Sequence, residues 1–467
     1  MKIKNISDLI SNGDIESRKI VLDISEQVLQ RLDAEVTIRK VVHLDGDLLK
    51  IGDSEWDISK YSNIYILGAG KACNSMIKAV YSILGNKITH GIGIVKKQSH
   101  DDNYPNIEIH QGGHPIPNLS GLEASQQILE LVDSAKPTDL FISLISGGSS
   151  ALMNFPIDGI SLEDEQQVSR ELLNAGARIM EINAVRRHIS QTNGGRLAQR
   201  IEQIGAELIN LIIWDVVGDE LKSDLHEPVS SFFGTPVAAD NTTVEDAIHT
   251  IDTYKLWNKL PKSVISYLRS NSDNLETPKT LDDRISHFIL QVPAETCETT
   301  QIICEEKGIS NLILSSCLEG DSRGSGIFLS AIVREINNYQ RPIAPPCLLI
   351  VGGESTVTVG NHTGKGGPNQ ELVLSFAQET SDLSGVCIAA IGTDGTDGPT
   401  LFAGGIADSQ TEAAAIQAGI KLSDYLSEHN VYKALKHLGI GIITGNTGTN
   451  LCDLILIYIP DNSSQRV

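Results

Sequence analysis

The feature that most constrains the fold is an apolar run that ends abruptly in glycines and a lysine. Residues 61–72 are Tyr-Ser-Asn-Ile-Tyr-Ile-Leu-Gly-Ala-Gly-Lys-Ala, and residues 64–67 within them are typical of a buried strand. Met76, Val80 and Leu84 mark the apolar face of a helix that follows. The pattern therefore predicts a strand, a glycine turn and a helix, with backbone N–H groups and the positive helix end aimed at an anion.

Lys71 adds a mobile positive charge at the same turn, so a phosphate or a carboxylate would suit it. The spacing is not a complete dinucleotide-binding fingerprint, because Cys73 stands where the third glycine would be. It is not a Walker A loop either. A tight strand-to-helix turn with a surface lysine is the alternative interpretation of Gly68, Gly70 and Lys71.

Length and composition limit the class of protein. A chain of 467 residues is long enough for two or three domains, each with its own core. No apolar run approaches the roughly 20 residues of a membrane span, and the N-terminus lacks the apolar core of a secretion signal. We therefore expect a cytoplasmic protein with no membrane partner. The net charge of −22 disfavours nucleic acid as a partner, because nucleic acid requires clustered Lys and Arg.

The seven cysteines are scattered, odd in number and without a C-x-x-C pair, which argues against a disulfide framework and against a zinc site. Strand-like runs alternate with helical segments along the chain, which predicts an α/β fold. Buried strands are expected at residues 64–67, 91–96, 107–110, 140–145, 207–213, 311–316, 386–391 and 454–459, and two more, joined at glycines, within 348–359. Residues 245–292 are expected to be helical, with a domain boundary near 290–300.

Glycine-rich turns recur at the predicted strand ends, at residues 68–70, 112–113, 147–148, 194–195, 352–353, 364–367 and 392–398. Open α/β sheets bind ligands at the carboxyl ends of their strands, so we expect these loops to meet in one cleft between two domains. A polyanion site is favoured by the polar residues among them: Lys71, Ser149, Asp215, Glu354, Lys365, Asp394 and Asp397. The carboxylates also indicate a divalent cation. Simple capping of turns is the alternative for the aspartates of residues 392–398.

Charged residues in the first half of the chain suggest further chemistry. Asp215 follows a predicted strand, where a magnesium ligand or a base is common, and Asp219 comes soon after it. A positive cluster stands out in an acidic chain, and it consists of Arg186, Arg187, His188 and Arg196. The alternative for this cluster is a solvated helix face.

An ordered set of motifs resembles the glycerate 2-kinase family: residues 68–72, 112–117, 146–152, 183–188, 194–198, 352–357, 369–372, 392–400 and 447–450. The resemblance spans about residues 60–460. It implies a Rossmann-like, parallel-sheet N-terminal domain at residues 1–295 and a MOFRL-type α/β domain with a mixed sheet at residues 296–467. It also implies phosphorylation of the 2-hydroxyl of D-glycerate, or of a related small hydroxy acid, with ATP and Mg²⁺.

The resemblance assigns roles to individual residues. Lys71 and Asp215 would be catalytic, with Lys71 neutralising the charge of the substrate carboxylate or of the phosphoryl group. Asp215 and Asp219 would hold Mg²⁺. Substrate and nucleotide contacts are expected from Gly68, Gly70, His114, Ser146, Gly147, Gly148, Ser149, Arg187, Glu354, Lys365, Asn369, Asp394 and Asp397. A homodimer is an assembly that the sequence neither requires nor excludes.

Three positions depart from the family pattern. Pro368 replaces an arginine before Asn-Gln-Glu, Asn193 replaces a lysine before Gly-Gly, and Trp214 replaces a serine. The lost arginine is expected to bind a phosphate or a carboxylate, and proline lacks even an N–H donor. A changed acceptor is the interpretation that we favour. A relative that binds a nucleotide or an organic acid without transferring phosphate is the alternative, and a hydroxypyruvate reductase, which the incomplete dinucleotide turn does not support, is another.

Overall fold

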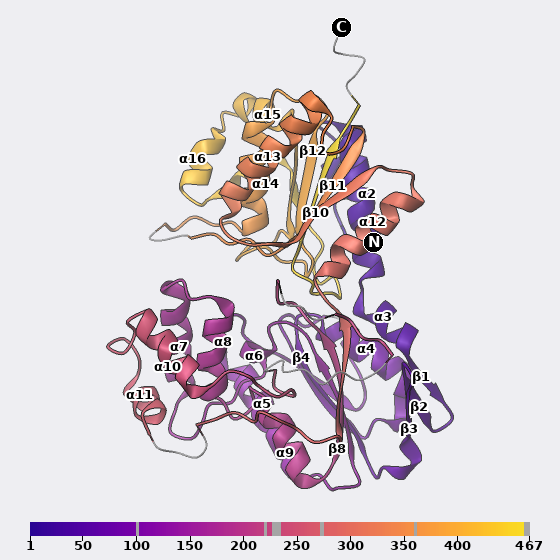
Figure 1. The fold of residues 1–467 in the computed structure, drawn as a ribbon, viewed down its shortest axis with the longest axis vertical. Coiled ribbons are helices and arrows are strands. Elements are labelled where there is room, and N and C mark those ends of the chain that lie inside the picture. Colours follow the sequence, from indigo (N-terminus) through magenta and orange to yellow (C-terminus); the bar gives the residue numbers. More distant parts are fainter. Residues whose placement is uncertain (100–101, 219–221, 227–234, 271–274, 359–361, 462–467) are drawn as a thin grey trace. The chain divides into compact units, whose positions relative to one another are not determined.

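The computed structural model describes residues 1–99, 102–218, 222–226, 235–270, 275–358 and 362–461. The chain forms two compact units (Figure 1). The parallel-sheet unit comprises residues 34–214 and 222–291, and the mixed-sheet unit comprises residues 1–33, 215–221 and 292–467. The cleft expected between two domains stays a prediction.

The parallel-sheet unit contains a six-stranded sheet in which all neighbouring strands are parallel. Its strands are β4 (Ile64–Gly70), β5 (His90–Val95), β6 (Ile107–Gln111), β7 (Leu140–Ile145), β8 (Glu207–Ile213) and β9 (Ile285–Gln291). Their order is β6-β5-β4-β7-β8-β9, so the chain starts in the middle, runs outward to β6 and returns to the other side of β4. This doubly wound order confirms the predicted Rossmann-like sheet.

The helices of this unit pack on the sheet or on one another. They are α3 (Ala34–Val41), α4 (Cys73–Leu84), α5 (Leu119–Asp133), α6 (Ser149–Leu152), α7 (Leu162–Asn174), α8 (Ile179–His188), α9 (Arg196–Ile204), α10 (Val244–Thr253) and α11 (Lys262–Leu268), with short 3-10 helices at Ile58–Lys60 and Gly85–Lys87. Ser161 caps α7 in a capping box with Asp164, as its sequence predicts. Helices α7, α8, α10 and α11 share an apolar core of their own, with Val168, Val185 and Ile251 inside it.

Two features of this unit differ from the prediction. Residues 285–291 were expected to be helical and form the edge strand β9 instead, because a short apolar run has no periodicity that separates a strand from a helix. A three-stranded antiparallel sheet was not expected at all, and it consists of β1 (Val42–Asp45), β2 (Leu48–Ile51) and β3 (Ser54–Asp57). Its four-residue strands are too short to give a clear alternating pattern.

The mixed-sheet unit also contains six strands, in the order β10-β11-β15-β12-β13-β14. They are β10 (Asn311–Leu318), β11 (Cys347–Gly353), β12 (Cys387–Gly392), β13 (Gly404–Asp408), β14 (Gly441–Ile442) and β15 (Asp453–Ile459). Only β10 and β11 are parallel, which confirms the predicted mixed sheet. The second strand expected after the glycines at 352–353 is wrong for the described residues 354–358, where Thr356 makes only an isolated bridge.

Helices cover both faces of the mixed sheet. They are α1 (Ile6–Leu9), α2 (Ile15–Arg31), α12 (Ala294–Glu306), α13 (Ser322–Tyr339), α14 (Pro368–Glu379), α15 (Thr411–Gln417), α16 (Leu422–Ser427) and α17 (Val431–Leu438). Helices α2 and α12 lie on one side of the strands, and α13 and α14 lie on the other (Figure 1). Side chains of α13 and α14 share one apolar core with the inner residues of the sheet.

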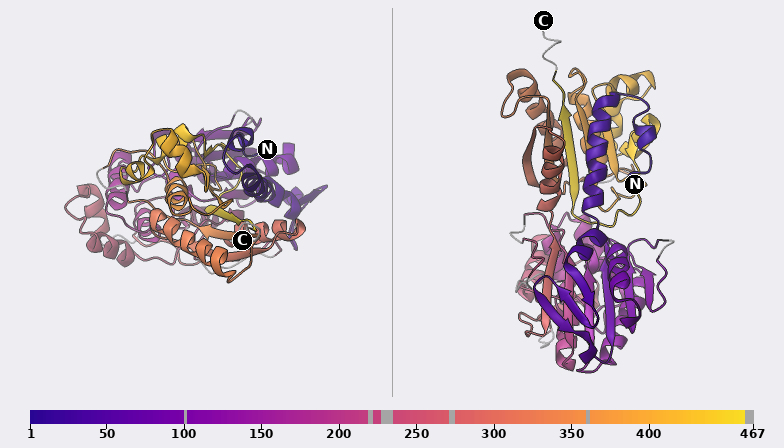
Figure 2. Two further views of the ribbon diagram at one scale, coloured as in Figure 1. Left: turned by 90° about the horizontal axis from the view of Figure 1, so that it is seen from above. Right: turned by 90° about the vertical axis from the view of Figure 1, so that its right-hand side faces the viewer.

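The N-terminal segment belongs to the mixed-sheet unit, in which α2 lies along the strands (Figure 2, right). Arg18 Nε makes an ion pair with Asp408 Oδ2 at 2.6 Å, and both side chains are buried. Ser17 Oγ donates to the carbonyl of Gly385 at 2.7 Å. The unit therefore differs from the predicted domain 296–467 in containing residues 1–33, and the predicted division at 295/296 stays a prediction.

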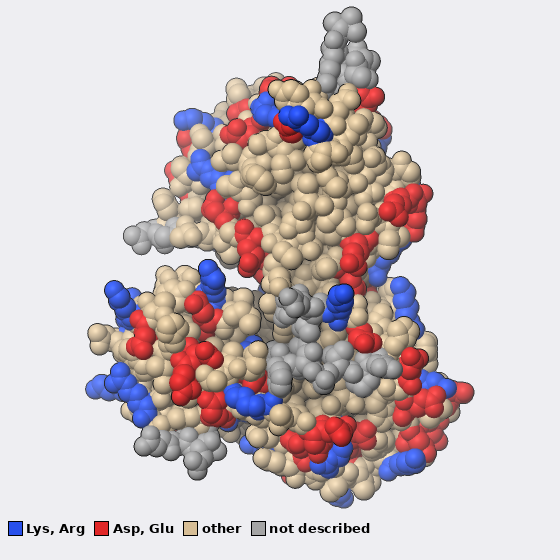
Figure 3. Space-filling model, viewed as in Figure 1, with Lys and Arg blue, Asp and Glu red and all other residues tan. Residues whose placement is uncertain are grey.

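The surface agrees with the charge of the sequence. On the face shown in Figure 3, Lys and Arg lie singly or in small groups among Asp and Glu, which is unlike the clustered cations of a nucleic-acid-binding surface. None of the helices within the described residues has the length and the apolar character needed to cross a membrane.

Candidate active site

The ends of β4 and β7 lie side by side where the strand order of the parallel sheet reverses, which is where open α/β sheets bind ligands. The turns after these strands are joined by hydrogen bonds. Ser146 N donates to the carbonyl of Ala69, and Lys71 N donates to that of Gly147, both at 3.0 Å. Ala72 N donates to Ser146 Oγ, also at 3.0 Å. The glycine turn at residues 68–72 and the serine turn at residues 146–149 are therefore joined into one hydrogen-bonded structure.

Two glycines of this structure are required by close contacts. Gly70 has φ +141°, and a Cβ there would lie 2.0 Å from Ser146 Oγ. A Cβ on Gly68 would lie 2.6 Å from Cys73 Sγ, so Gly68 lets α4 pack closely on β4. Ser146 is buried and its hydroxyl oxygen accepts from Ala72, so its contacts hold the turn. Its predicted contact with a ligand stays a prediction.

Three predicted site residues converge at Gly148. This glycine has φ +85°, and a Cβ on it would lie 2.9 Å from His114 Cδ2 and 3.5 Å from Lys71 Cγ. Lys71 follows β4, His114 follows β6 and Gly148 follows β7, and the side chains of Lys71 and His114 are half-buried. A lysine ammonium group and an imidazole held near backbone N–H groups suit an anionic ligand that also carries a hydroxyl group.

The serine turn continues into α6. Ser149 is its first residue, is buried and donates through its N–H to the carbonyl of Ser146 at 3.3 Å. Asn193, at the position of the family's lysine, is fully buried, and its Nδ2 donates to the carbonyl of Ser150 at 3.1 Å. Asn193 therefore supports the serine turn through this hydrogen bond.

The positive cluster is not a solvated face, so that alternative is wrong. Arg186, Arg187 and His188 are buried in α8. Arg187 Nη1 pairs with Asp240 Oδ1 at 2.9 Å, and burial lowers the pKa of the Arg187 guanidinium. Asp240 also accepts from Thr242 N at 3.1 Å. The described contacts of Arg187 are thus those of a buried ion pair, and its predicted ligand contact stays a prediction.

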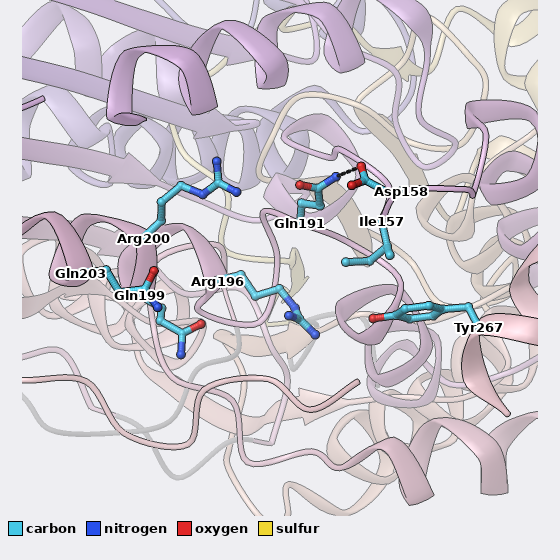
Figure 4. Close-up of a pocket in the computed structure, with 8 residues that line it drawn as sticks. All are labelled: Ile157, Asp158, Gln191, Arg196, Gln199, Arg200, Gln203 and Tyr267. Atoms are coloured by element: carbon cyan, nitrogen blue, oxygen red, sulfur yellow. Dashed lines mark hydrogen bonds between the residues drawn. The ribbon is translucent and has the colours of Figure 1, made fainter. Parts of the chain in front are cut away.

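Arg196, the remaining member of the cluster, faces a different hollow (Figure 4). This cavity of about 370 Å³ is lined by Ile157, Asp158, Gln191, Arg196, Gln199, Arg200, Gln203 and Tyr267. None of these residues belongs to the predicted site, so the sequence cluster is divided between two places in the structure.

In the mixed-sheet unit, the predicted glycine loops surround Asp453, a residue that the sequence analysis missed. Asp453 begins β15 and lies opposite Gly353 of β11 and Gly392 of β12. Asn369 Nδ2 donates to Asp453 Oδ1 at 2.7 Å. Burial raises the pKa of Asp453 well above its usual range, and the negative charge of Glu354 adds to this. The only signal in the sequence was its position three residues after the motif at 447–450.

Asp397 caps α14. The N-cap residue Gly367 has no side chain, and Asp397 accepts instead from Asn369 N at 3.1 Å and from Gln370 N at 2.9 Å. Gln370 Nε2 donates to the same carboxylate at 2.9 Å. Burial raises the pKa of Asp397 to about 6, although these hydrogen bonds act to lower it. Since the carboxylate already occupies these amides, the N-terminus of α14 offers them to no phosphate.

The other predicted site residues near Asp397 do not cap α14 through a buried carboxylate. Asp394 Oδ1 accepts from Thr396 N at 2.8 Å, which is the turn-capping contact of the alternative interpretation. Glu354 and Lys365 are exposed, and the carbonyl of Lys365 accepts from Tyr432 N at 2.9 Å. Pro368 is the first residue of α14, where its missing N–H leaves no hydrogen bond unmade.

Asp215 belongs to the mixed-sheet unit. Its half-buried carboxylate accepts from Asn450 Nδ2 at 2.7 Å, and its carbonyl accepts from Cys452 Sγ at 3.0 Å. Asp219 lies outside the described residues. Within the described ranges, no group of three or more His, Cys, Asp and Glu side chains could hold a metal ion by itself. Asp215 does fit the single carboxylate that Mg²⁺ commonly uses beside phosphate oxygens.

Comparisons with known proteins cover both units. Residues 20–269 match the family described as Domain of unknown function (DUF4147), and residues 347–453 match the MOFRL family. The chain is 36% identical over 448 residues to a glycerate 2-kinase of Pyrococcus horikoshii, covering 95% of this chain and 98% of the relative. It is 37% identical over 393 residues to a D-glycerate 2-kinase of Thermotoga maritima, covering 84% of this chain and 90% of the relative.

Solved structures agree with these matches. A crystal structure of a glycerate kinase from Thermotoga maritima superposes with a TM-score of 0.75 and 33% identity, covering 94% of this chain and 99% of that chain. A crystal structure of a Pyrococcus horikoshii protein superposes with a TM-score of 0.71 and 35% identity, covering 95% of this chain and 99% of that chain.

Proposed function

Because this chain belongs to the glycerate 2-kinase family, we propose that it transfers the γ-phosphoryl group of ATP to the 2-hydroxyl of D-glycerate or of a related small hydroxy acid. The observation that carries the proposal is the convergence of Lys71, His114 and Gly148 at the reversal of strand order. The half-buried Lys71 would supply the positive charge that an anionic substrate needs in a protein whose net charge is −22.

Phosphoryl transfer needs positioning and charge neutralisation more than covalent chemistry, because its transition state is loose. Lys71 would neutralise negative charge on the substrate carboxylate or on the transferring group. His114, whose ring also lies close to Gly148, would hydrogen-bond the acceptor and orient its hydroxyl. Gly148 keeps the space between them open, because any Cβ there would press against the imidazole.

The proposal assigns Asp215 to the binding of Mg²⁺. Bound at this site, Mg²⁺ would supply positive charge that neutralises the phosphate groups. Asp215, oriented by Asn450, is the residue that would hold it, and Asp219 stays a prediction for the same role. Asn369, Glu354, Lys365 and the loop at 392–398 are the proposed contacts of the mixed-sheet unit with nucleotide or acceptor.

An ADP-release assay with ATP and Mg²⁺ tests the proposal across D-glycerate, erythronate and related hydroxy acids. Turnover with any of these acids excludes the binding-only alternative, which rests on the changes at Pro368, Asn193 and Trp214. If no acid is turned over while nucleotide still binds, the kinase proposal fails. Oxidation of NAD(P)H by hydroxypyruvate tests the reductase alternative separately.

Cellular location and assembly belong to the same proposal. A cytoplasmic enzyme is supported by the seven scattered cysteines, which are odd in number and contain no C-x-x-C pair. A homodimer stays a prediction, and light scattering coupled to gel filtration measures the mass that decides it.

A further inference from the structure

The loop that carries His114 is held by side chains from two helices. Arg186 of α8 donates through Nη2 to the carbonyl of Pro115 at 2.8 Å. Gln166 of α7 donates through Nε2 to the carbonyl of Pro117 at 2.9 Å. These carbonyls lie immediately after His114 and three residues after it, so both helices fix the path of the backbone that presents the imidazole.

The guanidinium group of Arg186 is itself fixed. It is buried, and its Nε and Nη2 donate to Ser169 Oγ at 3.3 and 3.2 Å. Glu165 is also buried nearby, and burial raises the pKa of its carboxyl group to about 8, although the positive charge of Arg186 acts to lower it. Because a guanidinium group has donors in a rigid planar fork, Arg186 reaches Ser169 and Pro115 at the same time. The shorter lysine side chain has no such fork.

The loop has little freedom to adjust if this support is removed. A Cβ on Gly113 would lie 2.4 Å from the carbonyl of Ile116, so the backbone is already tightly folded. On the other side, the His114 ring lies against Gly148, where even a methyl group would come within 2.9 Å. A shift of the Pro115 carbonyl therefore moves the imidazole relative to Lys71.

We propose that Arg186 is a positioning residue, which holds His114 in place at the candidate active site through the carbonyl of Pro115, and that Gln166 supports it at Pro117. The inference rests on the proposed function for its kinetic consequence and deepens it. It also explains why a positive side chain is buried in α8: the guanidinium acts on the loop and does not contact the substrate.

The kinetic test compares Arg186→Lys with Arg178→Lys, a matched control at the exposed start of the same helix. We expect Arg186→Lys to lower kcat/KM for D-glycerate by about tenfold, on the scale of a misplaced contact, and Arg178→Lys to change it by less than twofold. The same substitution is then made in a His114→Ala background. If Arg186 acts through His114, it has less than a twofold effect there.

A tenfold loss that persists in the His114→Ala background overturns the proposal, as does an Arg186→Lys variant with wild-type kinetics. Because Arg186 is buried, the variant can fail to fold, and Gln166→Ala provides the second route. We expect this milder variant to lower kcat/KM for D-glycerate by about threefold with an unchanged melting temperature, on the scale of one lost neutral hydrogen bond. A folded Gln166→Ala protein with an unaltered kcat/KM contradicts the positioning role.

Failure of the proposed function is distinguished by a readout that needs no turnover. The imidazole resonances of His114 are followed by NMR in protein labelled with ¹⁵N-histidine and assigned with His114→Ala. We expect them to shift in Arg186→Lys and in Gln166→Ala and to stay in place in Arg178→Lys. Unchanged resonances in both test variants overturn the positioning role, whether or not any hydroxy acid is phosphorylated.

Discussion

The two units use glycine-rich turns at strand ends for different purposes. In the parallel-sheet unit, the turns at Gly70 and Gly148 bring the half-buried side chains of Lys71 and His114 together. In the mixed-sheet unit, the loops enclose carboxylates such as Asp397, which accepts hydrogen bonds from the first amides of α14. Glycine permits close approach in both places, and the neighbouring side chains decide whether a ligand or another part of the chain approaches.

The buried carboxyl groups of the mixed-sheet loops have shifted pKa values. Burial raises the pKa of both Asp397 and Asp453, because a low-dielectric environment disfavours the ionised carboxylate. Amide donors from Asn369 oppose that effect at both carboxyl groups. We therefore expect substitutions near Lys71 to change catalysis more than stability and substitutions near Asp397 to change stability first.

The largest effect is expected for Lys71→Met. Loss of the ammonium group removes charge neutralisation from the transition state, so kcat should fall on the order of 10²–10³-fold, as for other preorganised donors. The free energy of unfolding should stay within about 0.5 kcal/mol of the wild type. Lys78→Met is the control, because Lys78 is exposed on α4, the helix that follows Lys71, and its ion pair with Glu35 is a surface one. Steady-state kinetics with saturating ATP measure the difference in kcat between the two variants. Full activity of Lys71→Met would contradict the catalytic role of Lys71.

Asp397→Ala should have the largest effect on stability. It leaves the buried donors of Asn369 and Gln370 without their acceptor, which should lower the free energy of unfolding by about 3 kcal/mol. Asp321 caps α13 in the same way, through Gly324 N, but is exposed. Asp321→Ala should therefore cost only about 1 kcal/mol. Urea denaturation of both variants makes the test, and equal losses would mean that burial of the cap is unimportant.

Two glycines, Gly148 and Gly159, distinguish the effect of steric contact at the site from the effect of backbone strain. Gly148 and Gly159 have φ of +85° and +90°, but a Cβ on Gly148 meets His114 whereas a Cβ on Gly159 meets nothing within 4 Å. Both alanine variants should lose about 1 kcal/mol of stability from the left-handed backbone. Only Gly148→Ala should lower kcat/KM, by about tenfold. A similar kinetic loss in Gly159→Ala would show that strain alone accounts for the effect.

The raised pKa of Asp397 predicts a smaller, pH-dependent effect. The carboxyl group keeps its proton up to a pKa of about 6 in the folded protein and releases it near 3.9 in the unfolded chain. Between these values the folded state binds more protons, so the free energy of unfolding falls as pH rises. From pH 4.5 to 5.5, the wild type should lose about 1 kcal/mol relative to Asp397→Asn, which does not titrate. A relative gain over this range would mean that hydrogen bonding outweighs burial.

The sequence predicted most strands of the two six-stranded sheets, but not the edge strands β9 and β14 or the inner strand β13. Strands such as β4 are continuous apolar runs that end at glycines, and such runs are recognisable without a structure. Strand β9 contains the polar residues Ser286 and His287 and follows a helical region. Its pairing with β8 is therefore evident only in the structure. The sequence of the first 33 residues does not indicate that they belong to the mixed-sheet unit, because Asp408, the partner of Arg18, is 390 positions away.

The sequence predicted which types of residue form the site, but not the role of each one. Asp394 and Asp397 look alike in one glycine-rich loop, yet Asp397 is distinguished by donors 27 and 28 residues away. Arg186 likewise appeared only as a member of a positive cluster, because its acceptor at Pro115 lies 71 positions earlier in the chain. Long-range partners of this kind decide the role of a polar side chain, and no local pattern contains them.

The smallest effect on stability is expected for Pro368→Arg, which restores the family residue at the start of α14. Pro368 is only half-buried, and an added N–H in the first turn needs no intrahelical partner. Loss of the proline ring should cost about 0.4–1 kcal/mol. Asn193→Lys should cost far more, because it would place a charge at a fully buried position whose amide now supports Ser150. The two substitutions therefore have to be made separately.

Pro368→Arg alone tests whether the mixed-sheet unit contributes to acceptor choice. An arginine can bind a carboxylate or a phosphate bidentately, so we expect kcat/KM for D-glycerate to rise by about tenfold, the 1.4 kcal/mol of one charge-assisted contact. Pro261→Arg, at the N-cap of α11, controls for the substitution itself. If the wild type already phosphorylates D-glycerate efficiently and Pro368→Arg adds nothing, the changed-acceptor interpretation is wrong. The exposed Lys365, three residues earlier, then becomes the cation to test, and Lys365→Ala should raise KM for the acceptor.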